Sequence, residues 1–97
     1  MTIEKEVNGS CTKLILSGWM DTENAPQLAI AVDALDPDVK SLVLDMSGLE
    51  YMSSAGIRQL IATHKRMNGE MTLRNVQPVV MDVLSTLGLD KKLNFEP

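Results

Sequence analysis

The segment that decides the fold reads Asp45-Met46-Ser47-Gly48-Leu49-Glu50-Tyr51-Met52-Ser53-Ser54-Ala55-Gly56. A short apolar run, Ser41–Leu44, comes directly before it and predicts a strand that is buried on both faces. After it, apolar residues recur at helical spacing and predict a helix from Ser54 to Met67. The chain therefore passes from the carboxyl end of a buried strand into a helix. At this edge, open α/β sheets usually meet ligands and partners.

Toward the amino terminus, the pattern predicts a hairpin. Ile3–Val7 and Cys11–Ser17 are the expected strands, the second with Leu14 and Leu16 on one face. Asn8-Gly9 favours a tight turn between them because both residue types tolerate positive φ. Gly18 is expected to end the second strand. Trp19–Pro26 is expected to be a loop that becomes a helix, with Thr22 or Asn24 as its cap.

The remaining elements alternate between helices and strands. The first helix should stop at Asp36-Pro37, and Asn68-Gly69 should close the second in a left-handed conformation. Met71–Arg74 predicts another strand, and Leu93–Phe95 is expected either to add a last short strand or to pack against the sheet. Between these two, Gln77-Pro78 should open a third helix that ends at Gly88, with its inward face formed by Val80, Val83, Leu84 and Leu87.

The predicted order is β-β-α-β-α-β-α, within a single domain that spans residues 1–97. Strands separated by helices imply parallel pairing, while the hairpin adds an antiparallel pair. The expected fold class is therefore α/β, with a mixed sheet of four to five strands covered by helices.

Composition limits the possible functions. The chain has 97 residues, is 44% apolar and carries a formal net charge of −4, which disfavours nucleic acid and anionic membranes as partners. The lone Cys11 is consistent with a reducing compartment, and the charged first residues do not resemble a signal peptide. No apolar run approaches the roughly 20 residues that span a bilayer. We therefore expect a cytoplasmic protein with no membrane insertion.

An enzyme is not expected. Ser54 and His64 lie ten residues apart on one predicted helix. At about 1.5 Å per residue they are separated by roughly 15 Å, too far for a catalytic triad with Asp45. One His and one Cys give no metal-ligand pairs, and phosphate-binding glycine loops are missing from the sequence. We expect neither a metal nor a cofactor.

The helix entrance allows two interpretations. Exposed backbone amides and the helix dipole favour an anion or a phosphate beside Ser53 and Ser54. On the other hand, serine is a common helix cap, and Gly56 can serve only to allow close packing. Spacing alone leaves both interpretations open.

The whole pattern resembles the STAS-domain family, in particular the bacterial anti-sigma factor antagonists. The family pattern begins with Asp, any residue and Ser. After a few further residues come an aromatic residue, Met or an aliphatic residue, a small or acidic residue, Ser, a small residue and Gly. The places are filled in register by Asp45, Ser47, Tyr51, Met52, Ser53, Ser54, Ala55 and Gly56. Three further segments resemble the family in order: Gly18–Asp21, Gly69–Leu73 and Val83–Leu89.

The resemblance implies a phosphorylation switch. In the family, the serine that matches Ser54 is phosphorylated by a partner that is both an anti-sigma factor and a serine kinase. The unphosphorylated antagonist binds that partner and a sigma factor is released, whereas the phosphorylated form lets go. Many members have Asp where this chain has Ser53, which makes Ser53 the second choice of phosphoacceptor.

The resemblance also implies a partner surface and further partners. A phosphatase could reset the site, and we expect a monomer when the chain is free. The residues expected on the partner surface are Asp21, Thr22, Ser53, Ser54, Ala55, Gly56 and Arg58.

Alternatives remain at this point. Asp21 can equally be a turn or capping residue. Trp19, the only tryptophan, can be a binding anchor or simply a packed side chain. The alternative function within the same fold is a stand-alone STAS subunit that docks on a transporter ATPase or serves as a signalling scaffold.

Overall fold

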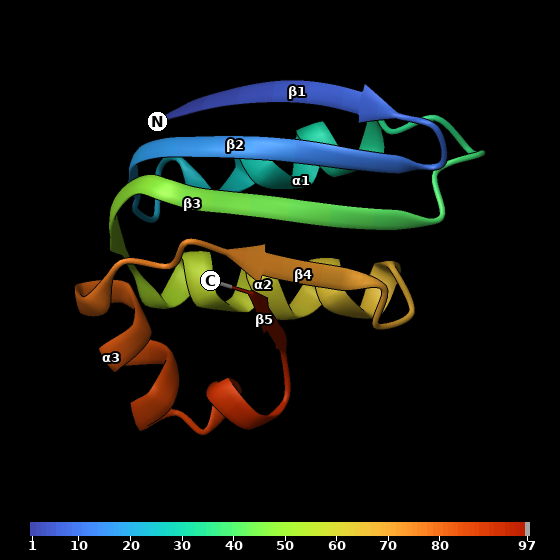
Figure 1. Cartoon of the computed structure of the whole chain (residues 1–97). Coiled ribbons are helices and arrows are strands. Elements are labelled where there is room, and N and C mark those ends of the chain that lie inside the picture. Colours follow the sequence, from blue (N-terminus) through green and yellow to red (C-terminus); the bar gives the residue numbers. More distant parts are fainter. Residues whose placement is uncertain (97) are drawn as a thin grey trace.

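The computed structural model describes residues 1–96; Pro97, the last residue of the predicted domain, lies outside the described residues. The predicted order of elements is confirmed (Figure 1). Along the chain the elements are β1 (Thr2–Asn8), β2 (Cys11–Met20), α1 (Ala25–Asp33), β3 (Ser41–Met52), α2 (Ser54–Arg66), β4 (Met71–Arg74), α3 (Pro78–Thr86), the short 3-10 helix η1 (Leu89–Lys91) and β5 (Asn94–Glu96).

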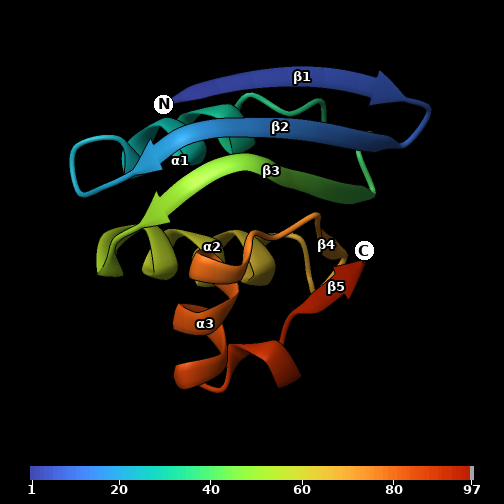
Figure 2. The ribbon, with the colours of Figure 1, turned by 60° about the vertical axis from the view of Figure 1, so that its left-hand side comes forward.

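The five strands form one mixed sheet in the order β1-β2-β3-β4-β5. β1 runs antiparallel to β2, and the other three neighbouring pairs are parallel. Two helices, α1 and α2, lie side by side behind the sheet, and α3 packs against β3 and η1 (Figures 1 and 2). The α/β class and the mixed sheet agree with the sequence prediction.

Only one face of the sheet is fully buried. In β2, Leu14 and Leu16 point into the core, as predicted, and in β3 Leu42 and Leu44 do the same. The residues between them, such as Val43, are half-buried. The prediction that the third strand is buried on both faces is therefore wrong, because the helices gather on one side and leave the other face partly open to water.

The hairpin turn lies one residue later than predicted. Asn8 still pairs with Cys11 in the ladder, so the two loop residues are Gly9 and Ser10. Gly9 has a φ of +64°, whereas Asn8 is not among the residues with positive φ. A glycine at the first loop position is typical of a type II′ turn, which matches the twist of the two strands.

Both central strands are longer than predicted. β2 continues through Gly18, with a φ of +95°, to Met20, and β3 continues from Leu44 to Met52. Two register shifts interrupt their pairing, and at each of them β3 advances one residue more than β2. The shifts lie between the pairs Ile15–Asp45 and Ser17–Gly48, and between Gly18–Leu49 and Trp19–Tyr51. These bulges bend the strands, which curve toward α2 in Figure 2.

The helix boundaries are close to the predictions. Asn24 is the N-terminal flanking residue of α1, but its side chain does not cap the helix. Asn68 and Gly69 both have positive φ after α2, as expected for a left-handed closure. In α3 the inward prediction holds for Val80 and Leu84 only. The sequence placed two more side chains inside, and these lie on the exposed side of the short helix: Val83 and Leu87.

Candidate functional site

The candidate site lies where β2 and β3 end beside the start of α2. The backbone amide of Ser53 donates to the carbonyl oxygen of Met20 at 2.9 Å, which ties the two strand ends together. Both Met20 and Met52 are buried beneath this junction. The carboxyl edge of the sheet, which the sequence indicated, thus brings the two serines next to the end of β2.

The two serines have different surroundings. Ser53 is the N-cap of α2, and its half-buried hydroxyl oxygen accepts from the amide of Gly56 at 3.3 Å. Ser54 is the first helical residue and is exposed. Within residues 1–96, its hydroxyl makes no hydrogen bond to another side chain or to the backbone. The structural role of a capping serine therefore falls to Ser53, and the accessible hydroxyl is that of Ser54.

Gly56 has a packing role. A Cβ atom at this position would lie 2.9 Å from the Met20 carbonyl oxygen and 3.0 Å from Cγ of Met52. Because real Cβ atoms are not found that close to backbone oxygen, only glycine lets α2 approach the end of β2 at this distance. The close-packing interpretation of Gly56 is the one that the structure supports.

The other residues expected on the partner surface surround this junction. One carboxylate oxygen of Asp21 accepts from the amide of Asn24 at 2.8 Å, so Asp21 shapes the turn that leads into α1. Thr22 and Arg58 are exposed, and Ala55 is half-buried. The structure thus assigns Asp21 a turn-forming role, while the exposed side chains remain available for contact.

Asp45 and Ser47, two residues of the sequence pattern, have a local role in β3. The Ser47 amide donates to a carboxylate oxygen of Asp45 at 3.0 Å, beside the first bulge. Burial raises the pKa of Asp45, but hydrogen bonds from Ser47 and Asn75 and the charge of Lys13 outweigh it. The pKa of Asp45 consequently lies below its ordinary value, which marks a carboxylate held in its ionised form.

Sequence reasoning missed one feature of this edge. Trp19 and Tyr51 are partners in the β2–β3 ladder, and their ring centroids lie 5.6 Å apart with an interplanar angle of 51°. Trp19 is 57% exposed and Tyr51 45% exposed. The pairing was hidden because the second bulge shifts the register, so that counting residues along the two strands does not align these two positions.

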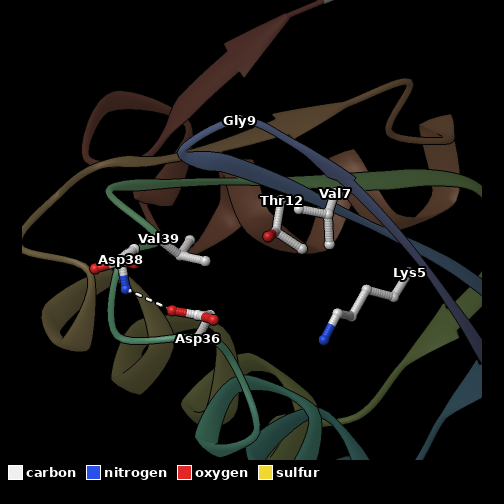
Figure 3. A pocket seen from close by; sticks show the side chains of 7 residues that line it. All are labelled: Lys5, Val7, Gly9, Thr12, Asp36, Asp38 and Val39. Atoms are coloured by element: carbon white, nitrogen blue, oxygen red, sulfur yellow. Dashed lines mark hydrogen bonds between the residues drawn. The ribbon is translucent and has the colours of Figure 1, made fainter.

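A separate hollow of about 280 Å³ lies at the opposite end of β2, beneath the β1–β2 hairpin (Figure 3). Lys5 and Asp36 point into it from opposite sides (Figure 3). The hydroxyl of the fully buried Thr12 also lines it and has no hydrogen-bond partner among residues 1–96. The length of β2 separates this hollow from Ser54, so it does not belong to the candidate site.

Neither a metal site nor a membrane-spanning helix is found within residues 1–96. In the described part of the chain, no three His, Cys, Asp or Glu side chains gather as they would around a metal ion. None of the helices within residues 1–96 is both long enough and apolar enough to cross a bilayer. His64 lies near the far end of α2, beside Gly69, and is well removed from Ser54.

The fold and this junction define a small α/β domain with a serine-bearing helix start at the carboxyl edge of its sheet. Residues 2–97 match the STAS domain family. The chain belongs to the STAS-domain family, which the sequence pattern had predicted.

Several similar proteins within this family are anti-sigma factor antagonists by name. BtrV of Bordetella bronchiseptica, whose name describes it as an anti-sigma factor antagonist, is 34% identical over 77 residues. That match covers 75% of this chain and 66% of BtrV, so the chain spans slightly less than two thirds of that relative. An anti-sigma factor antagonist from Mycobacterium paratuberculosis has a similar structure, with a TM-score of 0.87 and 28% identity; 99% of this chain and 85% of that one are covered.

SpoIIAA, another anti-sigma factor antagonist, shares the fold. Its unphosphorylated form superposes with a TM-score of 0.81 at 20% identity, over 99% of this chain and 89% of that one. SpoIIAA of Bacillus has also been solved in a phosphorylated form, with a TM-score of 0.71 at 17% identity over 99% and 92% of the two chains. At this level of identity the likeness concerns the fold.

Proposed function

We propose that this chain is an anti-sigma factor antagonist that is switched by phosphorylation at Ser54. In this proposal, the unphosphorylated chain binds a cytoplasmic anti-sigma factor with serine kinase activity, and a sigma factor is released. The observation that carries the proposal is the contrast between the two serines: the Ser53 hydroxyl is engaged as a helix cap, and the Ser54 hydroxyl is exposed and unbonded within the described residues. The chain acts as a binding module and not as an enzyme.

Physical chemistry supports a switch that leaves the fold intact. A phosphate adds roughly −1.5 to −2 charges at neutral pH. At the first position of α2 the helix dipole favours such a charge by about 0.3–1 kcal/mol. The domain therefore tolerates the group. A partner surface that fits closely here meets a bulky dianion, and each 1.4 kcal/mol of repulsion weakens binding about tenfold.

The relatives support the same proposal. BtrV is named as an anti-sigma factor antagonist, and SpoIIAA exists in unphosphorylated and phosphorylated forms on this fold. The expected partner surface combines the exposed Thr22, Ser54 and Arg58 with Ala55 and the turn held by Asp21.

The test uses a purified anti-sigma factor with serine kinase activity from the same host as this chain. We expect the unmodified chain and Ser54→Ala to bind it, and Ser54→Asp to bind at least about tenfold more weakly. Incubation with ATP should place phosphate on Ser54, as read by phosphopeptide mass spectrometry. Equal binding by Ser54→Ala and Ser54→Asp would contradict the proposal.

Ser53→Ala is the matched control. It removes the N-cap, so it should lower the free energy of unfolding by about 1 kcal/mol. It should nevertheless leave phosphate incorporation at Ser54 in place. Phosphate found on Ser53 of the wild-type chain, and not on Ser54, would show that Ser53 is the phosphorylated residue.

A further inference from the structure

The aromatic pair Trp19–Tyr51, hereafter the aromatic patch, is unusual in this chain. The chain has only three aromatic residues, and two of them form this exposed pair. A core residue would be buried, and the buried core here is aliphatic and methionine-rich. Exposed Trp and Tyr side chains of this kind are enriched at protein–protein contact sites.

The aromatic patch lies beside the switch position. Trp19 is followed by Met20, whose carbonyl oxygen accepts from the Ser53 amide at 2.9 Å, and Tyr51 is only two residues before Ser53 on β3. Asn24, at the start of α1, donates from its side chain to the carbonyl oxygen of Trp19 at 3.3 Å. One backbone hydrogen bond and one bond from a side chain to the backbone therefore hold the end of β2 next to Ser54.

The charged side chains closest to the aromatic patch in the sequence are acidic, and the α-amino group of Met1, beside Gly18, is the one cationic group that adjoins them among residues 1–96. Neither residues 14–39 nor residues 41–57, which include the ends of β2 and β3, contain a lysine or an arginine. Both segments carry acidic residues next to the patch: Asp21 and Glu23 follow Trp19, and Glu50 precedes Tyr51. None of these three carboxylates is in a salt bridge with another residue of the described range 1–96. The nearest basic residue along α2 is Arg58.

We propose that the aromatic patch is an anchor for a basic partner surface, with an arginine of that partner stacked on the Trp19–Tyr51 pair. Guanidinium groups bind favourably over the faces of Trp and Tyr rings, and the surrounding carboxylates add complementary charge. The occupant is the anti-sigma factor of the proposed function, so this inference rests on that function. It adds a binding determinant that is separate from the phosphorylated residue.

The first test uses the free chain and its single tryptophan. Quenching of Trp19 fluorescence by caesium and by iodide is measured against free tryptophan amide. The inference predicts efficient quenching overall, with caesium relatively favoured over iodide by the acidic surroundings. Glu50→Gln should reduce that preference. An emission maximum typical of a buried indole, or a preference for iodide, would contradict the inference without any partner being present.

The second test uses the same purified serine kinase as the test of the proposed function. On binding, the Trp19 emission of the wild-type chain should become protected from quenchers. Trp19→Ala and Tyr51→Ala should each weaken binding about tenfold or more, as central aromatic anchors do. Val7→Ala is the matched control, because Val7 is 63% exposed and pairs with Thr12 beside the hairpin turn, at the opposite end of β2 from the aromatic patch. The affinity of this variant should not change.

The outcomes separate the two proposals. If Ser54→Asp abolishes binding while Trp19→Ala binds within about twofold of wild type and Trp19 stays quenchable, the anchor is wrong and the switch stands. If the wild-type chain does not bind the kinase, the proposed function is wrong, and so is the proposal that this kinase binds the aromatic patch. Circular dichroism and thermal unfolding of each variant show whether lost affinity reflects lost folding. If a variant is unfolded, the protection of Trp19 from quenchers in the wild-type complex tests the anchor instead.

Discussion

The two ends of the β2–β3 pair differ in every respect that matters for function. At the amino end, five consecutive residue pairs from Cys11–Ser41 to Ile15–Asp45 are in regular parallel register, above a core of leucines. At the carboxyl end, two bulges break the register, glycines sit at close contacts, and large aromatic side chains face water. The regular end builds the core, and the irregular end presents side chains that the core does not need.

This difference is informative because the same two strands provide both ends. Bulges disrupt a ladder and redirect side chains, so they weaken packing locally. Their presence at the end that carries Ser54 and the aromatic patch, and not at the other, indicates that the shape of the carboxyl edge is fixed by more than the needs of folding. Substitutions at the two ends should therefore affect stability and binding differently.

The largest expected effect in the free chain is at the irregular end. Gly56→Ala places a Cβ atom 2.9 Å from the backbone oxygen of Met20, which cannot move as a side chain could. We expect the free energy of unfolding to fall by about 2 kcal/mol, measured by denaturant titration. Ser54→Ala, two residues away and exposed, is the control and should stay within about 0.5 kcal/mol of wild type. Equal stability of the two variants would show that α2 can move away from β2 freely.

A smaller effect of opposite sign is expected at the regular end. Thr12 is fully buried and its hydroxyl has no partner within residues 1–96. Thr12→Val keeps the shape and removes the unpaired polar group, so the free energy of unfolding should rise by about 1 kcal/mol. Thr12→Ser, which keeps the hydroxyl and loses the methyl group, is the control and should destabilise. A loss of stability in Thr12→Val would mean that the hollow in Figure 3 holds an ordered water bonded to this hydroxyl.

The sequence predicted the fold well where the strands and helices have regular spacing of buried residues, and less well where bulges interrupt that spacing. Alternation predicted the buried Leu14 and Leu16, and Asn68-Gly69 predicted the left-handed end of α2. The same reasoning failed for β3, because its buried residues are spaced two apart up to Met46 and then three apart to Leu49 and Met52. Buried residues that are three apart do not show the alternation of a strand, so a bulged strand is easily predicted as a loop or as the start of a helix.

The candidate site was predictable in part for the same reason. The pattern located the serine pair at the carboxyl edge. Spacing could not tell which serine caps the helix, since serine suits that position in either case. The contact that requires glycine at position 56 joins α2 to β2, which are far apart in sequence, and no local signal encodes it. The pairing of Trp19 with Tyr51 depends on a register that the second bulge sets.

The smallest predicted effect concerns Asp45, at the boundary between the regular and irregular ends. Its pKa is lower in the folded chain than the ordinary value, so the ionised carboxylate adds stability above its unfolded pKa of about 3.9, and this is lost as the pH falls through the folded pKa. Asp45→Asn should therefore show a smaller drop in unfolding free energy between about pH 7 and about pH 3 than wild type. Glu23→Gln is the exposed control. An unchanged pH dependence in Asp45→Asn would show that ionisation of Asp45 does not contribute to the stability of the fold.

The hydrogen bond between Ser53 and Met20 has a kinetic consequence. With both strand ends clamped by main-chain atoms, a group added at the neighbouring hydroxyl finds a platform that is already in its final shape. Phosphorylation of Ser54, as proposed, then requires no refolding of the domain before it changes binding. Under the proposed function, the rate of switching is then set by turnover of the kinase and by dissociation of the complex, and not by a rearrangement of this chain.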